Sequence, residues 1–133
     1  MAHDWSVLER DLRRCLPPRA IVAKRQELLS YDCDGLTLER HCPPLAVLPE
    51  TTEQVSQVMA LADAHDTVVV PQGGNTGFMG GATPDVSGNS ILLSLRRMNR
   101  IREIDATNMS MTGEAGCVLQ TLHDTTEKQG LYF

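Results

Sequence analysis

The segment from Pro71 to Gly81 holds the residues whose types and spacing best suit ligand binding. It contains five of the ten glycines of the 133-residue chain, together with Asn75 and Thr76. Successive backbone N–H groups in such a loop form a concave site for anions, above all phosphate, because glycines leave room for a ligand against the backbone. The Thr76 hydroxyl adds a donor, and Asn75 adds either its side-chain amide or a left-handed backbone conformation. The segment therefore predicts a binding loop, with a wide surface turn as the alternative.

Two familiar phosphate loops are excluded. A Walker A loop ends in Gly-Lys-Ser/Thr, and the segment contains no lysine. The dinucleotide fingerprint has Gly-x-Gly-x-x-Gly at the start of a helix, whereas Gly74, Gly77 and Gly80 are spaced by three. The next apolar run, residues 90–94, predicts a buried strand rather than a helix.

The elements before the loop must position it. Residues 45–48 form a short apolar run that predicts a strand ending at Pro49. The Thr-x-x-Gln spacing that begins at Thr51 is typical of a helix capping box, and apolar residues at helical spacing continue to about His65. Residues 68–70 are three valines, which predict a buried strand. Strand, helix and strand in this order indicate a βαβ unit in an α/β or α+β domain.

Five further segments complete the expected organisation. Residues 4–16 predict a helix with Asp4 as its N-cap, and residues 20–29 a weaker helix. Residues 30–44 are irregular in composition and lead into the domain as a loop. Residues 101–104 and 108–112 predict a hairpin, and residues 117–128 a helix followed by Gly130 in the left-handed conformation.

The composition excludes several classes of protein. Twelve basic and seventeen acidic residues give a net charge of −5, which argues against a nucleic-acid partner. No apolar stretch is long enough to span a membrane. Four arginines nevertheless lie within seven residues, and we expect a solvated face there, with a phosphate or partner site as the alternative. These arginines are Arg96, Arg97, Arg100 and Arg102.

No residue is a convincing catalytic base, and no metal site is predicted. The four cysteines contain no Cys-x-x-Cys pair, and the four histidines show no ligand-like spacing. The start of the sequence lacks the features of a secretory signal, so we expect reduced thiols in a cytoplasmic protein. The residues concerned are Cys15, Cys33, Cys42, Cys117, His3, His41, His65 and His123.

Three stretches of the sequence resemble a known family. They are residues 31–36 leading through Pro44 to 45–55, the loop 71–81, and residues 93–101 with 114–117. They are similar to the FAD-binding domain of the vanillyl-alcohol oxidase/PCMH-type flavoprotein superfamily. Within it, the chain most resembles the FAD-linked D-2-hydroxyacid dehydrogenases, such as the glycolate oxidase D subunit, D-lactate dehydrogenases and D-2-hydroxyglutarate dehydrogenases.

This resemblance implies a cofactor and its binding residues. The loop would hold the FAD pyrophosphate, and because it contains no histidine or cysteine, attachment would be non-covalent. Gln72 differs from the arginine common in glycolate oxidase subunits and is more similar to the other two branches. The backbone N–H groups of Gly73, Gly74, Asn75, Thr76 and Gly77 would bind the pyrophosphate, with Gly80 and Gly81 closing the loop and Pro71 and Gln72 leading into it beside the cofactor.

The resemblance also implies an α+β fold and an oxidoreductase activity. In the complete enzymes, a hydride passes from C2 of a small 2-hydroxyacid (glycolate, D-lactate or D-2-hydroxyglutarate) to the flavin, giving a 2-oxo acid. We expect residues 1–44 to be a helical N-terminal segment with a loop leading into the domain, and residues 45–133 an incomplete first subdomain that lacks the catalytic half. The alternatives are a non-catalytic product and a small anion-binding module. A complementary subunit or self-association would cover the apolar surface that an incomplete domain exposes.

Overall fold

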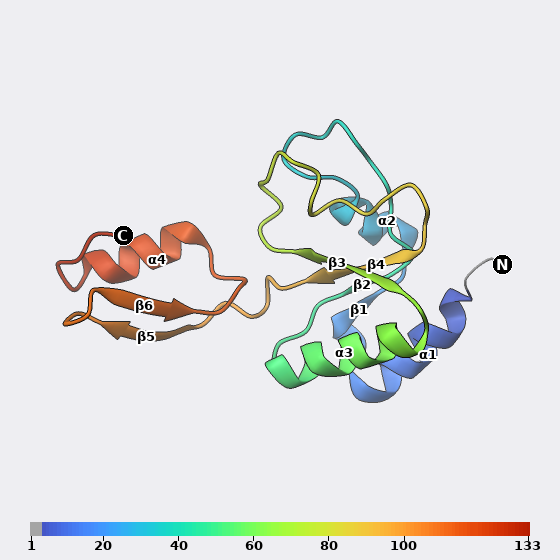
Figure 1. Ribbon diagram of the computed structural model, residues 1–133, viewed down its shortest axis with the longest axis horizontal. Coiled ribbons are helices and arrows are strands. Elements are labelled where there is room, and N and C mark those ends of the chain that lie inside the picture. The colour runs from blue at the N-terminus through green and yellow to red at the C-terminus, as the bar shows by residue number, and fades with distance from the viewer. Residues whose placement is uncertain (1–3) are drawn as a thin grey trace.

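The computed structural model of this chain describes residues 4–133, and its centre is a four-stranded sheet (Figure 1). The strand order is β1-β2-β4-β3, with β4 between the two strands of the predicted βαβ unit. Strands β2 and β3 each pair with β4 in parallel, and β1 pairs antiparallel to β2. The strands are β1 (Ile21–Val22), β2 (Ala46–Val47), β3 (Val68–Gln72) and β4 (Ser90–Ser94).

The two long helices begin where the sequence predicted. The Asp4 side chain accepts a hydrogen bond from the Ser6 N–H at 3.1 Å and caps α1 (Trp5–Cys15). The Thr51 hydroxyl accepts from the Gln54 N–H at 3.2 Å and caps α3 (Thr52–Ala64). The Gln54 side chain in turn accepts from the N–H of Glu50, one residue before the position that a standard capping box uses.

Two local predictions were wrong. Residues 20–29 do not form one helix: short 3₁₀ turns at Pro18–Ala20 and Leu29–Tyr31 enclose β1 and the single-turn α2 (Arg25–Leu28). Ile21 pairs with Val47 and is buried, so sheet formation outweighs helix propensity there. The valines of β3 are not buried, because β3 is an edge strand, and Val68 is 56% exposed.

The sheet is covered on both faces, most heavily by α1 and α3 on one side (Figure 1). Leu8 and Leu12 of α1 pack with Val58 of α3 and with Ile91 of β4 in the larger core cluster. On the other face, α2 and the turn after it contribute Leu28 and Tyr31 to a smaller cluster. We call residues 4–98 the sheet body.

The C-terminal arm, residues 100–133, extends to one side of the sheet body (Figure 1). It consists of the predicted hairpin, β5 (Ile101–Asp105) and β6 (Ser110–Gly113), and of α4 (Leu119–Glu127). Gly130 has φ of +70°, the left-handed conformation expected after this helix. Helices and both kinds of strand pairing in one chain confirm the α+β expectation.

Residues 4–44 are integrated with the rest, since β1 pairs with β2 and α1 packs on α3. The four cysteines are free. None of the helices in residues 4–133 is long and apolar enough to cross a membrane.

Candidate functional site

The glycine-rich loop leaves the sheet at the carboxyl end of β3. Because β2, β3 and β4 run in parallel, their carboxyl ends meet at one edge of the sheet, where ligands bind in open α/β sheets. All five glycines of the loop are exposed, and so are Pro71 and Thr76. The loop therefore presents its backbone to solvent directly beside the ends of the central strands.

Five consecutive backbone N–H groups in this loop are available to a ligand. Within residues 4–133, none of the N–H groups of residues 73–77 donates a hydrogen bond to another protein group. A Cβ atom added at Gly74 or Gly77 would meet no heavy atom within 4 Å, so the space over these glycines is open. The Asn75 side-chain oxygen is buried and has no hydrogen-bond partner among the described residues. The free N–H groups and the open space fit a cradle for an anionic group, to which the Asn75 oxygen, an acceptor, does not contribute.

The remaining residues of the loop hold its shape. Gln72 is 3% exposed, and its side-chain amide donates to the Ala82 carbonyl at 3.1 Å. Gln72 thus joins the two ends of the loop rather than presenting its amide to solvent. Asn75 has φ of +59°, and Gly80 has φ of +74°. The two left-handed positions turn the chain back over the end of the sheet.

A second segment, residues 33–35, lies against the loop from the side of α2 (Figure 1). The Asp34 side chain accepts from the Gly80 N–H at 2.9 Å, and the Gly35 N–H donates to the Gly77 carbonyl at 2.9 Å. The Asn75 side chain donates to the Cys33 carbonyl. Hydrogen bonding, above all from the Gly80 N–H, holds the pKa of Asp34 below its ordinary value, whereas burial raises the pKa of the Cys33 thiol.

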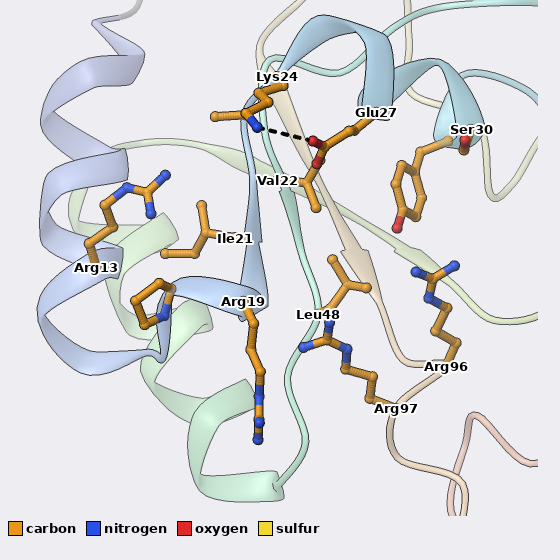
Figure 2. Close-up of a pocket in the computed structure, with 13 residues that line it drawn as sticks. Arg13, Arg19, Ile21, Val22, Lys24, Glu27, Ser30, Leu48, Arg96 and Arg97 are labelled. Atoms are coloured by element: carbon orange, nitrogen blue, oxygen red, sulfur yellow. Dashed lines mark ion pairs between the residues drawn. The ribbon is translucent and has the colours of Figure 1, made fainter.

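A group of five cationic side chains lies elsewhere, along the open edge of β1 (Figure 2). We call this cavity of about 550 Å³ the cationic groove. Most of its charge is neutralised within the chain, so an anion meets less unbalanced charge there than the number of cations suggests. Its cations are Arg13 (paired with Glu9), Arg19 and Arg97 (both with Glu50), Lys24 (with Glu27) and Arg96, which lies 5.6 Å from the centre of the Tyr31 ring.

The arginine run expected as a solvated face is mostly engaged with carboxylates of the chain. In addition to the Arg97–Glu50 pair at 3.5 Å, Arg100 and Arg102 both contact Glu114, at 3.1 and 3.2 Å. Hydrogen bonds from the Arg100 backbone and side chain lower the pKa of Glu114 to about 2. Arg97 therefore holds a carboxylate within the sheet body, whereas Arg100 and Arg102 hold one within the C-terminal arm.

The three histidines that the structure describes have different surroundings. His41 contacts Glu39 at 3.3 Å, and His65 contacts Asp11 at 3.2 Å. His123 packs edge-on against two aromatic rings of the C-terminal segment. His3 lies outside the described residues. Between residues 4 and 133, no cluster of three or more metal-binding side chains occurs.

Sequence reasoning missed the role of Asp34. Residues 30–44 were predicted only as a loop, and Asp34 forms a local turn in it, because its carboxylate accepts from the Leu36 N–H at 3.0 Å. The contact with Gly80 joins residues 46 positions apart, and no local pattern carries that information. The unusual density of polar and charged residues around Asp34 was the available signal.

Comparison with known proteins shows the family of the chain. A family model described as the FAD binding domain matches residues 43–133, the part that contains the loop, β4 and the C-terminal arm. The chain belongs to the FAD-binding domain family. The fold agrees with solved structures: p-cresol methylhydroxylase matches with a TM-score of 0.82 and 25% identity over 96% of this chain. The 4-ethylphenol oxidase from Gulosibacter chungangensis matches with a TM-score of 0.84 and 22% identity over 98% of this chain.

Curated relatives cover the same region. The D-2-hydroxyglutarate dehydrogenase of Xanthomonas citri is 37% identical over 124 residues, which is 92% of this chain and 25% of the relative. The probable mitochondrial D-2-hydroxyglutarate dehydrogenase of Oryza sativa subsp. indica is 32% identical over 130 residues, or 95% of this chain and 23% of the relative. The chain thus spans about a quarter of the length of these relatives, and likewise 25% of each of the two solved chains above.

Proposed function

We propose that the loop 71–81 binds the pyrophosphate of FAD. The N–H groups of residues 73–77 are the donors, Gly80 and Gly81 close the loop, and Pro71 and Gln72 lead into it. One observation carries the proposal: five consecutive backbone N–H groups are unused within the described chain, at the carboxyl ends of parallel strands. Backbone donors of this kind bind phosphate oxygens without a basic side chain.

The open space over the glycines supports the same assignment. The positions that a Cβ would occupy at Gly74, Gly77 and Gly81 are empty, so a flat diphosphate can approach the backbone. The loop contains no histidine or cysteine to form a bond with the flavin, so the cofactor is held non-covalently. FAD supplies the redox chemistry when it is bound, and the role of this chain is binding and orientation.

The complete protein is proposed to oxidise a D-2-hydroxyacid to a 2-oxo acid. The named relatives favour D-2-hydroxyglutarate over the other two candidates, D-lactate and glycolate. None of residues 4–133 combines a shifted pKa with a position suited to act as a base toward a substrate. The catalytic base and the acid-binding groups therefore belong to the part of the relatives that this chain does not span. The small anion-binding module stays the second candidate, because the same free N–H groups would serve it.

The remaining organisation is proposed on the same basis. Residues 45–133 are the first subdomain of the FAD-binding domain, with residues 1–44 as its helical lead-in. A complementary part of the domain, or a second copy, covers the C-terminal arm, where Val118 and Leu119 are 63% and 59% exposed. A cytoplasmic location remains a prediction, because several relatives have mitochondrial names and the Xanthomonas relative does not.

A titration with FAD tests the function. We expect the folded chain to bind FAD saturably and to bind ADP more weakly, because both ligands contain a pyrophosphate. Riboflavin, which has no pyrophosphate, should not displace bound FAD. Gly77→Val should abolish binding without unfolding the chain, since no heavy atom of the protein lies within 4 Å of the added Cβ. The matched control is Val86→Phe, which adds bulk at a position 84% exposed outside the loop. Equal FAD affinity in Gly77→Val and the wild type would contradict the proposal.

A further inference from the structure

Asp34 is a nearly buried carboxylate whose two oxygens serve two different segments. The residue is 7% exposed. One oxygen accepts from the Leu36 and Thr37 N–H groups at 3.0 and 3.3 Å, within its own turn. The other accepts from the Gly80 N–H at 2.9 Å, across 46 residues of sequence. The side chain therefore connects the segment before β2 to the far end of the glycine-rich loop.

The neighbours of Asp34 contact the loop at two further points. The Gly35 N–H donates to the Gly77 carbonyl at 2.9 Å, and the Asn75 side chain donates to the Cys33 carbonyl. A Cβ added at Gly35 would lie 3.1 Å from the Gly77 oxygen and from the Thr76 carbonyl group, so the two backbones are in close contact. We call residues 33–35 the strap.

The strap uses a particular set of loop atoms. It engages the Gly77 carbonyl, the Gly80 N–H and the Asn75 side chain, and it leaves the N–H groups of residues 73–77 unused. A loop with five glycines loses much conformational entropy when it is ordered, so a free loop binds a ligand weakly. Contacts that order the loop in advance lower the cost of binding.

The sign of the charge makes this position informative. A carboxylate close to a diphosphate site repels the ligand unless nearby hydrogen-bond donors compensate its negative charge. The Asp34 oxygens point their lone pairs at three backbone N–H groups, which compensate the charge and hold the carboxyl ionised. The loop residues 71–84 carry no titratable side chain. Besides Asp34, the charged or titratable groups of the adjoining residues 31–41 are Tyr31, Cys33, the Asp32–Arg40 ion pair at 3.2 Å and the His41–Glu39 contact at 3.3 Å.

We propose that Asp34 is a positioning residue, and that the strap holds the glycine-rich loop in the conformation that leaves its backbone N–H groups free for a pyrophosphate. Asp34 touches neither the ligand nor the five N–H groups; it acts through Gly80 and, with Gly35, through Gly77. The effect on cofactor affinity rests on the proposed function, whereas the effect on the loop itself does not.

Amide hydrogen exchange of the ligand-free chain tests the effect on the loop. In Asp34→Asn, the negative charge is lost and only one side-chain oxygen remains to accept hydrogen bonds from the two segments. The hydrogen bond from the Gly80 N–H is therefore weakened or lost. We expect the Gly80 amide to exchange at least about tenfold faster, as for loss of a hydrogen bond to a charged group. The amides of β4 should be unchanged. In the wild type, the Gly80 amide proton shift should follow the ionisation of Asp34 at acidic pH, and this titration should disappear in the variant.

Two further variants keep the test specific. Gly35→Ala should disturb the same loop amides by contact with Gly77, without altering any charge. Asp85→Asn is the matched control, because Asp85 forms a similar turn with Ser87 but is exposed and contacts nothing in the loop. Unchanged Gly80 exchange in Asp34→Asn, or the same acceleration in β4 as in the loop, would overturn the proposal.

The FAD affinity of the same variants separates the two proposals. We expect Asp34→Asn to weaken FAD binding by about tenfold and Asp85→Asn to leave it unchanged. Wild-type affinity in a variant whose loop has become mobile would overturn the positioning role. If the wild type did not bind FAD, but Asp34→Asn still accelerated exchange of the Gly80 amide, the proposed function would be contradicted. The proposal that the strap orders the loop would be supported.

Discussion

The sheet body and the C-terminal arm are stabilised in different ways. Within residues 4–133, every buried hydrophobic residue belongs to the sheet body, and the last of them is Met98. In the arm, only Glu114 and Thr126 are buried, and both are polar. The sheet body therefore has a core of its own, whereas the arm depends on hydrogen bonds and on whatever covers its apolar side chains.

The junction between the two regions is polar and tightly packed. At the start of the arm, Glu114 donates its N–H to the Arg100 carbonyl at 2.9 Å, and its side chain accepts from the Arg100 N–H at 3.0 Å, which fixes the strand next to the junction. The Gly116 N–H donates to the Met98 carbonyl at 2.8 Å. A Cβ added at Gly73 would lie 3.9 Å from the Ala115 carbonyl, so the junction also borders the glycine-rich loop. A change at the junction can thus reach the loop without passing through the core.

The largest expected difference concerns the cores. Leu92→Ala removes a fully buried side chain from the central strand and should lower the free energy of unfolding by about 2–5 kcal/mol. Leu119→Ala in α4, where the side chain is 59% exposed, should change it by no more than about 0.5 kcal/mol. Denaturant unfolding measures both. Equal effects would show that the arm shares the core of the sheet body.

The next effect concerns the junction. A Cβ at Gly116 would lie 2.0 Å from the Leu95 carbonyl oxygen, so Gly116→Ala must displace backbone. We expect a loss of about 1–3 kcal/mol, the usual cost of overpacking, and faster hydrogen exchange across the arm. Gly81→Ala is the control, because nothing lies within 4 Å of its added Cβ. If the arm amides were as protected from exchange in Gly116→Ala as in the wild type, the close contact at Gly116 would not be what orders the arm.

The sequence predicted the regular elements better than the contacts between them. Caps at Asp4 and Thr51 and the parallel arrangement of residues 45–48 and 68–70 follow from local patterns, and the structure confirms them. The strand at Ile21 was missed because its reason is pairing with Val47, which is distant in sequence. The exposure of β3 was missed because three valines predict a strand but not its place at the sheet edge.

In the candidate site too, the sequence pointed to local features but not to the contacts between distant segments. The glycines, Asn75 and Thr76 could be recognised from their types and spacing alone, since backbone donors need no partner elsewhere. The contacts of Asp34 and the inward position of Gln72 could not, because they depend on how two loops meet at the end of the sheet. Which side chains hold a loop is a tertiary property, whereas which loop is rich in backbone donors is a local one.

Acid should loosen the arm before the sheet body. Because the pKa of Glu114 in the folded chain is about 2 and its ordinary value is 4.5, its ionised form stabilises the fold fully above about pH 4.5. That contribution is lost as the pH falls from 4.5 toward 2. The protection factors of the arm amides, which compare exchange with the intrinsic rate at each pH, should therefore fall across this interval in the wild type. In Glu114→Gln the protection factors should already be low at pH 6 and should not show the wild-type fall on acidification; a wild-type pH response in this variant would assign the effect to other groups.

The smallest effect on the monomer concerns the exposed aromatics of the arm. Tyr132 is 92% exposed and Phe133 is 54% exposed, and both rings contact His123. Changing both to serine should alter unfolding by about 0.5 kcal/mol or less, as for other exposed positions. The same change should reduce self-association measured by sedimentation velocity. Association that persists unchanged would place the contact surface outside the arm.

The central claim is that the unused backbone N–H groups of the loop receive the pyrophosphate. Titration of the ¹⁵N-labelled chain with FAD, and with ADP for comparison, measures this at each amide. The largest shifts should occur at Gly73, Gly74, Asn75, Thr76 and Gly77 with both ligands, and the residues of the cationic groove should respond weakly. Shifts centred on Arg96 and Arg97, with the loop amides unchanged, would contradict the account.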